Sequence, residues 1–327
     1  MARENCAQRA QRGKCLLIVT AVILLSVIVL TTTLLIFKKE KAELQKWQGR
    51  GTTENLQEII LGRCFNFIRT VNPDQQRDID CVRIWKTFKN GFIQKNPCEI
   101  TVKDYQPLME LAAHSANKVP CNKTLLWSKS YDLAHRFAKA QRDFFTLEDT
   151  LLGYIADGIT WCGNSESSEV NYQSCPQWNE CTNSPESVYW KTASKMFAEA
   201  ACGVVHVMLN GSLGRDAFKN NSIFGSVEAL HLDPKKVHSV QIWVMHNIGG
   251  PANDSCKGSS VNYLKSILEK RNIKSFCEDN YRPVKFIQCA ENPDHRDCRF
   301  CEGQPVSERR YYSSKFSRQL QSFHSFK

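Results

Sequence analysis

The chain has 327 residues, 15 of them cysteine, and a formal net charge of +10. The basic excess is confined to the first 50 residues and to the tail from residue 304, whereas residues 51–303 hold equal numbers of acidic and basic side chains. This distribution gives little support to polyanion binding by the folded part, so no nucleic-acid partner is expected.

The first predicted element is a membrane anchor at residues 16–37. This stretch has no charged residue, no proline and no glycine. As a helix it would rise about 33 Å, enough to cross the hydrocarbon core of a bilayer. A cleaved signal peptide would have a shorter apolar core and a small-residue cleavage site, and neither is present. The anchor would follow a short N-terminus, 1–15, and precede a juxtamembrane stalk, 38–50.

Cysteines and glycosylation signals indicate which side of the membrane holds the rest of the chain. Both flanks of the anchor are basic, so the positive-inside rule does not decide the orientation. Thirteen of the 15 cysteines follow residue 60, a density typical of an oxidising compartment. Four N-glycosylation sequons lie in the same part, at Asn122, Asn210, Asn220 and Asn253. We therefore expect a single-pass type II plasma-membrane protein with a cytosolic N-terminus and an extracellular C-terminal part.

Beyond the stalk the hydrophobic pattern changes once. Residues 51–120 and 146–203 show apolar residues at three- and four-residue steps, which predicts helices. After Gly203 the sequence predicts strands at 204–209, 237–245 and 285–289 and a helix at 259–271, and a short earlier stretch, 123–128, predicts a further strand. The order of strands and helices favours a mixed α/β fold with a parallel sheet and crossover helices. The basic, serine-rich tail, 304–327, is expected to be disordered.

A few residues stand out as chemical candidates. Trp127 ends a predicted strand, where ligands bind in open α/β sheets. Trp127, Trp190 and Glu228 together would make a pocket that raises a carboxyl pKa and holds a cationic ring, although spacing alone does not bring them together. Glu148 and Asp157 are nine residues apart and would face opposite sides of a regular helix, which by itself favours a solvated helix face. The sequence contains neither a zinc-type set of His and Cys nor a P-loop or dinucleotide-binding glycine motif.

Several long motifs resemble one known family. The segments LLWS (125–128), TLEDTLLGY (146–154), NYQSCP (171–176), VYWKTAS (188–194) and FGSVE (224–228) are similar, in order and spacing, to the ADP-ribosyl cyclase/cyclic ADP-ribose hydrolase family. The resemblance covers about residues 1 to 300 and is strongest to the single-pass surface members. It implies a helical domain, 51–120 with 146–202, and a smaller domain, 121–145 with 203–303, that contains a four-stranded parallel sheet. The active-site cleft would lie between the two domains.

The resemblance also assigns roles to residues. Glu228 would be the catalytic acid, and Trp127 and Trp190 would flank the nicotinamide of the substrate. Glu148 and Asp157 would lie near the nicotinamide carboxamide, with Glu148 biasing the outcome towards hydrolysis over cyclisation. The ribose and phosphates would contact Ser128, Lys129, Ser194, Ser222 and Phe224. Two positions depart from the family pattern, because Ile223 stands where threonine is usual and Lys129 stands where arginine is common.

The implied activity is cleavage of the bond between nicotinamide and ribose in NAD. The products would be ADP-ribose and some cyclic ADP-ribose, and the enzyme would also hydrolyse cyclic ADP-ribose. NAD would be the substrate, so no cofactor and no metal are expected, and a homodimer and cell-surface protein ligands are possible partners. The alternative is a disulfide-bonded surface receptor or adhesion module with weak or lost catalysis. An O-glycosidase would need a second carboxylate close to Glu228.

Six disulfides are implied by the same resemblance and leave Cys301 over. The implied pairs are Cys64–Cys81, Cys98–Cys181, Cys121–Cys202, Cys162–Cys175, Cys256–Cys277 and Cys289–Cys298.

Overall fold

The computed structural model describes residues 23–33, 47–73, 79–116 and 119–301. The chain divides into two compact units, residues 1–48 and 49–327. In the first unit, residues 23–33 form a helix with exposed side chains. The other residues of the predicted anchor, the N-terminus, most of the stalk and the basic tail lie outside the described residues. Within the described ranges, no helix combines the length and the apolar character that a membrane span requires.

Helices dominate one part of the second unit, as predicted. Its longer helices, with the short α6, pack around a cluster of aromatic side chains in which the Trp161 indole donates to the Tyr105 hydroxyl at 2.8 Å. Local signals explain the starts of two helices: the Asp80 carboxylate caps α3, and Ser184 caps α7 ahead of Pro185. These helices are α2 (Leu56–Asn66), which continues into the π-helical turn η1 (Phe67–Val71), α3 (Cys81–Asn90), α4 (Val102–Ala116), α6 (Leu151–Ala156) and α7 (Pro185–Ala200).

The prediction of continuous helix over 146–203 is wrong in its middle. A small antiparallel hairpin, β2 (Gly163–Asn164) with β3 (Ser167–Val170), and irregular loops separate α6 from α7. This stretch is rich in Gly, Asn, Ser and Pro, which favour turns over helix. The Cys162–Cys175 disulfide ties the loop to itself.

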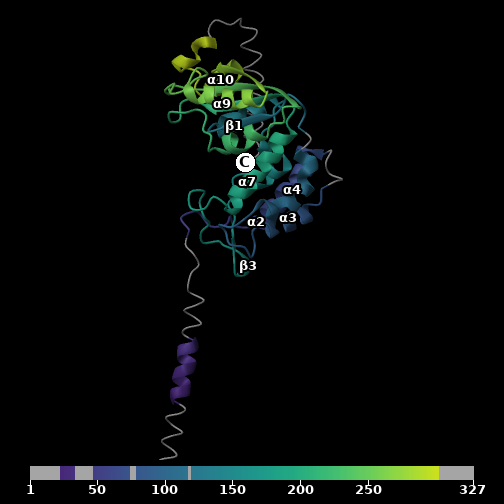
Figure 1. Ribbon diagram of the computed structural model, residues 1–327, viewed down its shortest axis with the longest axis vertical. Coiled ribbons are helices and arrows are strands. Elements are labelled where there is room, and N and C mark those ends of the chain that lie inside the picture. Colours follow the sequence, from purple (N-terminus) through teal and green to yellow (C-terminus); the bar gives the residue numbers. More distant parts are fainter. Residues whose placement is uncertain (1–22, 34–46, 74–78, 117–118, 302–327) are drawn as a thin grey trace, which may run out of the picture. The chain divides into compact units, whose positions relative to one another are not determined.

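The other part of the unit is a four-stranded, all-parallel sheet. Its strand order is β1-β4-β5-β6, and the strands are β1 (Leu125–Ser128), β4 (Gly203–Asn210), β5 (Val237–Met245) and β6 (Lys274–Asp279). Side chains alternate across β5: Ile242 and Val244 pack into the main core, whereas Trp243 and Met245 pack into a second cluster. Buried residues of α5 (Tyr131–Gln141) and α10 (Arg282–Glu291) complete this second cluster, and α9 (Ser259–Lys270) contributes to the main core. In Figure 1 the helices α9 and α10 lie with the sheet, and α2, α3 and α4 lie on the far side of α7.

The strand predictions at 123–128, 204–209 and 237–245 and the helix at 259–271 are confirmed. The strand predicted at 285–289 is wrong, because these residues belong to α10. Its buried positions are Val284, Ile287, Gln288 and Cys289, which include the three- and four-residue steps of a helix, and a proline occupies its first turn. The fourth strand is β6 instead.

All six expected disulfides are present. The structure pairs Cys64–Cys81, Cys98–Cys181, Cys121–Cys202, Cys162–Cys175, Cys256–Cys277 and Cys289–Cys298. Cys121–Cys202 joins the chain just before β1 to the residue just before β4, so it fastens the start of the two neighbouring strands.

Candidate active site

The carboxylate of Glu228 is placed by a tight turn. Residues Phe224–Glu228 form a π-helical turn, η4, that leads into the short helix α8 (Ala229–His231). The Ser222 hydroxyl accepts from the Gly225 amide at 3.0 Å and donates to the Lys219 carbonyl at 2.7 Å. A Cβ on Gly225 would lie 2.3 Å from that same carbonyl oxygen, so only glycine allows the chain to come this close. The turn therefore fixes the direction in which Glu228 points.

Glu228 is buried, and its environment favours the protonated form. Burial raises the pKa of Glu228 to about 8, and the negative charge of Glu148 adds to this effect. A hydrogen bond with Ser194, on α7, acts in the opposite direction. A positively charged ligand group beside Glu228 would favour the ionised carboxylate, because it would replace the solvation lost on burial.

Glu148 lies next to Trp127 at the end of β1. The Trp127 indole nitrogen is 3.4 Å from Glu148 Oε2, and the same oxygen is 3.1 Å from His135 Nε2. Burial raises the pKa of Glu148, but the hydrogen bond and charge of His135 outweigh it, so that the net shift is downward. The pKa of His135 is raised in turn: burial lowers it, and Glu148 more than compensates.

The prediction of a solvated helix face for Glu148 is wrong. The segment is not one helix: a 3₁₀ turn, η3 (Leu147–Asp149), ends at Thr150, whose backbone is extended, and α6 begins afterwards. A capping box between Thr146 and Asp149 starts this 3₁₀ turn. Only 10% of the Glu148 side chain is exposed.

Asp157 ends α6 and approaches the same group of side chains. Its Oδ2 accepts from the Tyr131 hydroxyl at 2.7 Å. The Tyr131 ring lies 4.0 Å from the His135 ring and meets the Trp127 ring edge-on at 5.4 Å. Neither Tyr131 nor His135 was predicted from the sequence to belong to the site. The available signal was the four-residue spacing of Tyr131 and His135, which places two rings on one face of α5 just after the strand that carries Trp127.

Helix α7 brings the second tryptophan and the serine to this region. Trp190 is half-buried and packs edge-on against Tyr189 at 5.5 Å, and Ser194 follows one turn later on α7. The turn η4 packs against α7 and β1, and η3 packs against α7. The segments that carry Trp127, Glu148, Trp190, Ser194 and Glu228 are therefore in contact with one another.

The remaining predicted contact residues surround this region with local roles of their own. Ser128 is buried, and Phe224 is buried edge-on against Phe218 at 5.8 Å. The Lys129 ammonium donates to the Leu213 and Asp216 carbonyls at 3.3 and 3.1 Å. Burial lowers the pKa of Lys129, and Lys219 adds to this effect.

The four predicted glycosylation sites differ in their exposure. Asn122, Asn220 and Asn253 are exposed. Asn210 is buried, and its side-chain oxygen accepts from the Ser212 and Leu213 amides.

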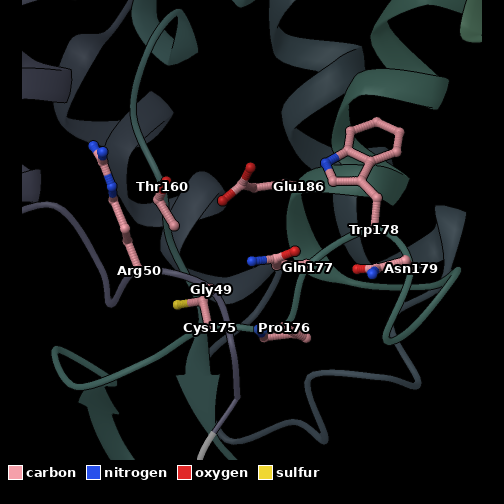
Figure 2. Close-up of a pocket in the computed structure, with 9 residues that line it drawn as sticks. All are labelled: Gly49, Arg50, Thr160, Cys175, Pro176, Gln177, Trp178, Asn179 and Glu186. Carbon is pink, nitrogen blue, oxygen red and sulfur yellow. The ribbon is translucent and has the colours of Figure 1, made fainter.

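A second carboxylate with a raised pKa lies beside a separate hollow of about 400 Å³. Burial raises the pKa of Glu186 to about 7, against hydrogen bonds with the Trp161 backbone and the Thr160 side chain. Figure 2 shows Glu186 near Thr160, with Trp178 on one side and Arg50 on the other. This hollow contains none of the site residues expected from the sequence. Across the described ranges, no group of three or more His, Cys, Asp or Glu side chains is placed to hold a metal ion.

Comparisons with known proteins identify the relatives of this chain. Residues 53–298 match the family model for ADP-ribosyl cyclase. The chain is 54% identical over 254 residues to the ADP-ribosyl cyclase/cyclic ADP-ribose hydrolase 1 of Rattus norvegicus, which covers 77% of this chain and 82% of that protein.

Solved structures show the same likeness. Porcine CD38 in complex with a covalent intermediate is similar with a TM-score of 0.68 and 49% identity, covering 72% of this chain and all of that one. Aplysia cyclase in complex with the substrate NGD and the product cGDPR is similar with a TM-score of 0.69 and 32% identity, covering 76% of this chain and 98% of that one.

Proposed function

This chain belongs to the ADP-ribosyl cyclase family, and on this premise we propose that it is a cell-surface NAD glycohydrolase and ADP-ribosyl cyclase that also hydrolyses cyclic ADP-ribose. The observation that carries the proposal is the environment of Glu228. The buried carboxylate of Glu228 hydrogen-bonds Ser194, and the segment that carries it packs against the segments of both tryptophans. NAD is the substrate, and the proposed chemistry uses no other cofactor.

One carboxylate is sufficient for this reaction. Cleavage of the bond between nicotinamide and ribose develops positive charge on the sugar, as in glycoside hydrolysis. Nicotinamide leaves as a neutral ring, so no general acid is needed to expel it. Glu228 stabilises the developing oxocarbenium-like centre or traps it covalently. The cationic nicotinamide ring of bound NAD lies between Trp127 and Trp190, where stacking and cation–π attraction hold it.

The substrate's other groups account for the remaining residues. Glu148 and Asp157 accept from the carboxamide of nicotinamide, and Glu148 biases the outcome towards hydrolysis. Water that reaches the ribosyl centre gives ADP-ribose, whereas attack by the adenine ring of the same molecule gives cyclic ADP-ribose. The balance depends on how well the site excludes water and orients the adenine. The ribose and phosphates contact Ser128, Lys129, Ser194, Ser222 and Phe224.

The proposal includes the topology of the chain. Residues 16–37 anchor it in the plasma membrane, with the catalytic part outside and Asn122, Asn210, Asn220 and Asn253 as glycosylation sites. A helical domain, 51–120 with 146–202, and a sheet domain, 121–145 with 203–303, face the substrate from two sides. Six disulfides, which the structure contains, suit an extracellular location.

The test incubates the full-length protein with NAD and resolves nicotinamide, ADP-ribose and cyclic ADP-ribose by chromatography. Glu228→Gln removes the charge with little change in shape, and we expect it to lower nicotinamide release by at least about 1,000-fold, the order of loss seen for essential catalytic groups. Glu186→Gln is the matched control, because it removes a half-buried carboxyl whose pKa is also raised; it should keep the parent rate within about twofold. A folded parent that releases no nicotinamide would overturn the enzyme proposal and leave a surface receptor as the alternative.

A further inference from the structure

The first two turns of α5 place a histidine against the carboxylate of Glu148. Trp127, Tyr131 and His135 follow one another at four-residue intervals, and their rings are in contact, with centroid distances of 5.4 Å for the first pair and 4.0 Å for the second. Trp127 and His135 also meet edge-on at 5.9 Å. The imidazole is therefore held in one orientation by its neighbours.

The contacts of the two ring nitrogens define the protonation of His135. Nδ1 lies 2.7 Å from the Tyr131 carbonyl oxygen, which can only accept, so Nδ1 carries a hydrogen. Nε2 lies 3.1 Å from Glu148 Oε2. It also lies 3.4 Å from the Thr146 hydroxyl, whose own hydrogen is donated to Asp149. Because both neighbours of Nε2 present lone pairs, the arrangement fits an imidazolium with a hydrogen on each nitrogen.

We propose that His135 is a positioning residue: as an imidazolium it holds Glu148 against the Trp127 indole and offsets the negative charge that Glu148 directs towards Glu228. This inference rests on the proposed function, because it assigns His135 a part in the same reaction. The Glu148 oxygen that meets His135 is the one that accepts from Trp127, so the imidazolium and the indole fix it together.

The other charged groups around His135 already have partners. Asp149, from η3, accepts from Thr146, and Asp157, at the end of α6, accepts from Tyr131. Asp132 on α5 contributes negative charge near Tyr131. The charge of Asp149 favours the imidazolium, and Glu148 is the carboxylate in contact with it. The pKa directions agree, since that of His135 is raised and that of Glu148 is lowered.

If His135 has this role, each substitution should move the pKa of Glu228 in a definite direction. The charge of Glu148 raises the pKa of Glu228, and the positive charge of His135 partly cancels it. His135→Gln leaves Glu148 without its cation, so the pKa of Glu228 should rise further. Glu148→Gln removes the repulsion at its source, so the pKa should fall. Once Glu148→Gln has removed this negative charge, His135 has nothing left to offset, so replacing it as well should change nothing further and the double variant should behave as Glu148→Gln does.

The experiment measures kcat/KM for NAD against pH for the full-length parent, His135→Gln, Glu148→Gln and the double variant. Since kcat/KM reports the free enzyme, its midpoint follows the ionisation of Glu228. We expect the midpoint of His135→Gln to move up by about half a pH unit, and the two variants that lack Glu148 to share one midpoint below that of the parent. His238→Gln, which replaces an exposed histidine of β5, should leave the profile unchanged.

Two kinds of failure are distinguishable. A parent that releases no nicotinamide would overturn the proposed function and this inference with it. An active parent whose midpoint is the same in His135→Gln, or a double variant in which the two shifts simply add, would overturn only the role of His135. If His135→Gln does not fold, NMR of labelled histidine decides: His135 should titrate above the ordinary histidine range in the parent and lower in Glu148→Gln. An unchanged titration would overturn the inference.

Discussion

Two glutamates, the buried Glu228 and the half-buried Glu186, have a raised carboxyl pKa in common and differ in their surroundings. Burial raises the pKa of Glu228 to about 8 and that of Glu186 to about 7. Each accepts from one hydroxyl side chain, Ser194 for Glu228 and Thr160 for Glu186. A raised pKa is therefore a mark of burial in this protein, and it does not by itself identify a catalytic group.

The neighbours separate the two glutamates. Glu228 ends a turn whose close backbone approach requires Gly225. The negative charge of Glu148 raises its pKa, and Glu148 is itself in contact with His135 and Trp127. Glu186 lies in the first turn of α7 beside an open hollow, where the positive end of the helix favours a carboxylate without any function. A second charged group and imposed backbone geometry distinguish a reactive site from a buried acid at a helix start.

The largest difference between the two glutamates is expected in the rate of nicotinamide release when each side chain is shortened by one methylene. Glu228→Asp withdraws the carboxylate by about 1.5 Å while keeping its charge, and we expect nicotinamide release from NAD to fall by about 100-fold or more, because the reacting atoms no longer meet. Glu186→Asp should leave the rate within about twofold. Comparable losses in the two variants would contradict the assignment of catalysis to Glu228 alone.

Both glutamates should contribute to the pH dependence of stability, each over a different pH range. Each carboxyl has a folded pKa above its unfolded value of 4.5, so the folded state keeps a proton that the unfolded state has lost, and stability falls as pH rises. For Glu228 the fall continues to about pH 8, and for Glu186 it ends near pH 7. Glu228→Gln should therefore raise Tm at pH 8 by several degrees, equivalent to a few kcal/mol, and Glu186→Gln by less because water reaches it.

The control for this measurement is Tm at pH 4.5, where both carboxyls are largely protonated in the folded state. There the two variants should match the parent closely. If the Tm difference between parent and both variants stays constant from pH 5 to pH 8, neither carboxyl has a raised pKa.

The central strands of the sheet could be predicted from the sequence, whereas its edge strand β6 could not. The C-terminal halves of the strands β4 and β5 are buried on both faces, so residues 207–209 and 242–245 are continuous apolar runs, as expected for central strands. The edge strand β6 is largely exposed and carries charged residues, so its composition gave no signal. The segment 285–289 has the composition of a strand, and only its buried positions, which belong to packing against α5, identify it as helix.

For the site, the sequence identified residues but not the contacts between them. Glu228 and the tryptophans were found from motifs and chemistry, and the glycine of the turn explains why Glu228 can be where it is. The burial of Glu148 was missed because it depends on a break at Thr150 and on His135, which belongs to another helix. Ion pairs between separate elements have no fixed spacing along a chain, so periodicity does not reveal them.

The smallest expected effect tests the hydrogen bonds of the two glutamates. Ser194→Ala removes a hydrogen bond that lowers the pKa of Glu228, so the midpoint of kcat/KM against pH should move up by about half a unit to one unit, as expected for a bond of about 1 kcal/mol. Thr160→Val removes the corresponding bond of Glu186 and should leave that midpoint unchanged. A midpoint for Ser194→Ala at or below that of the parent would mean that another group limits the reaction, because the loss of this bond can only make Glu228 harder to ionise.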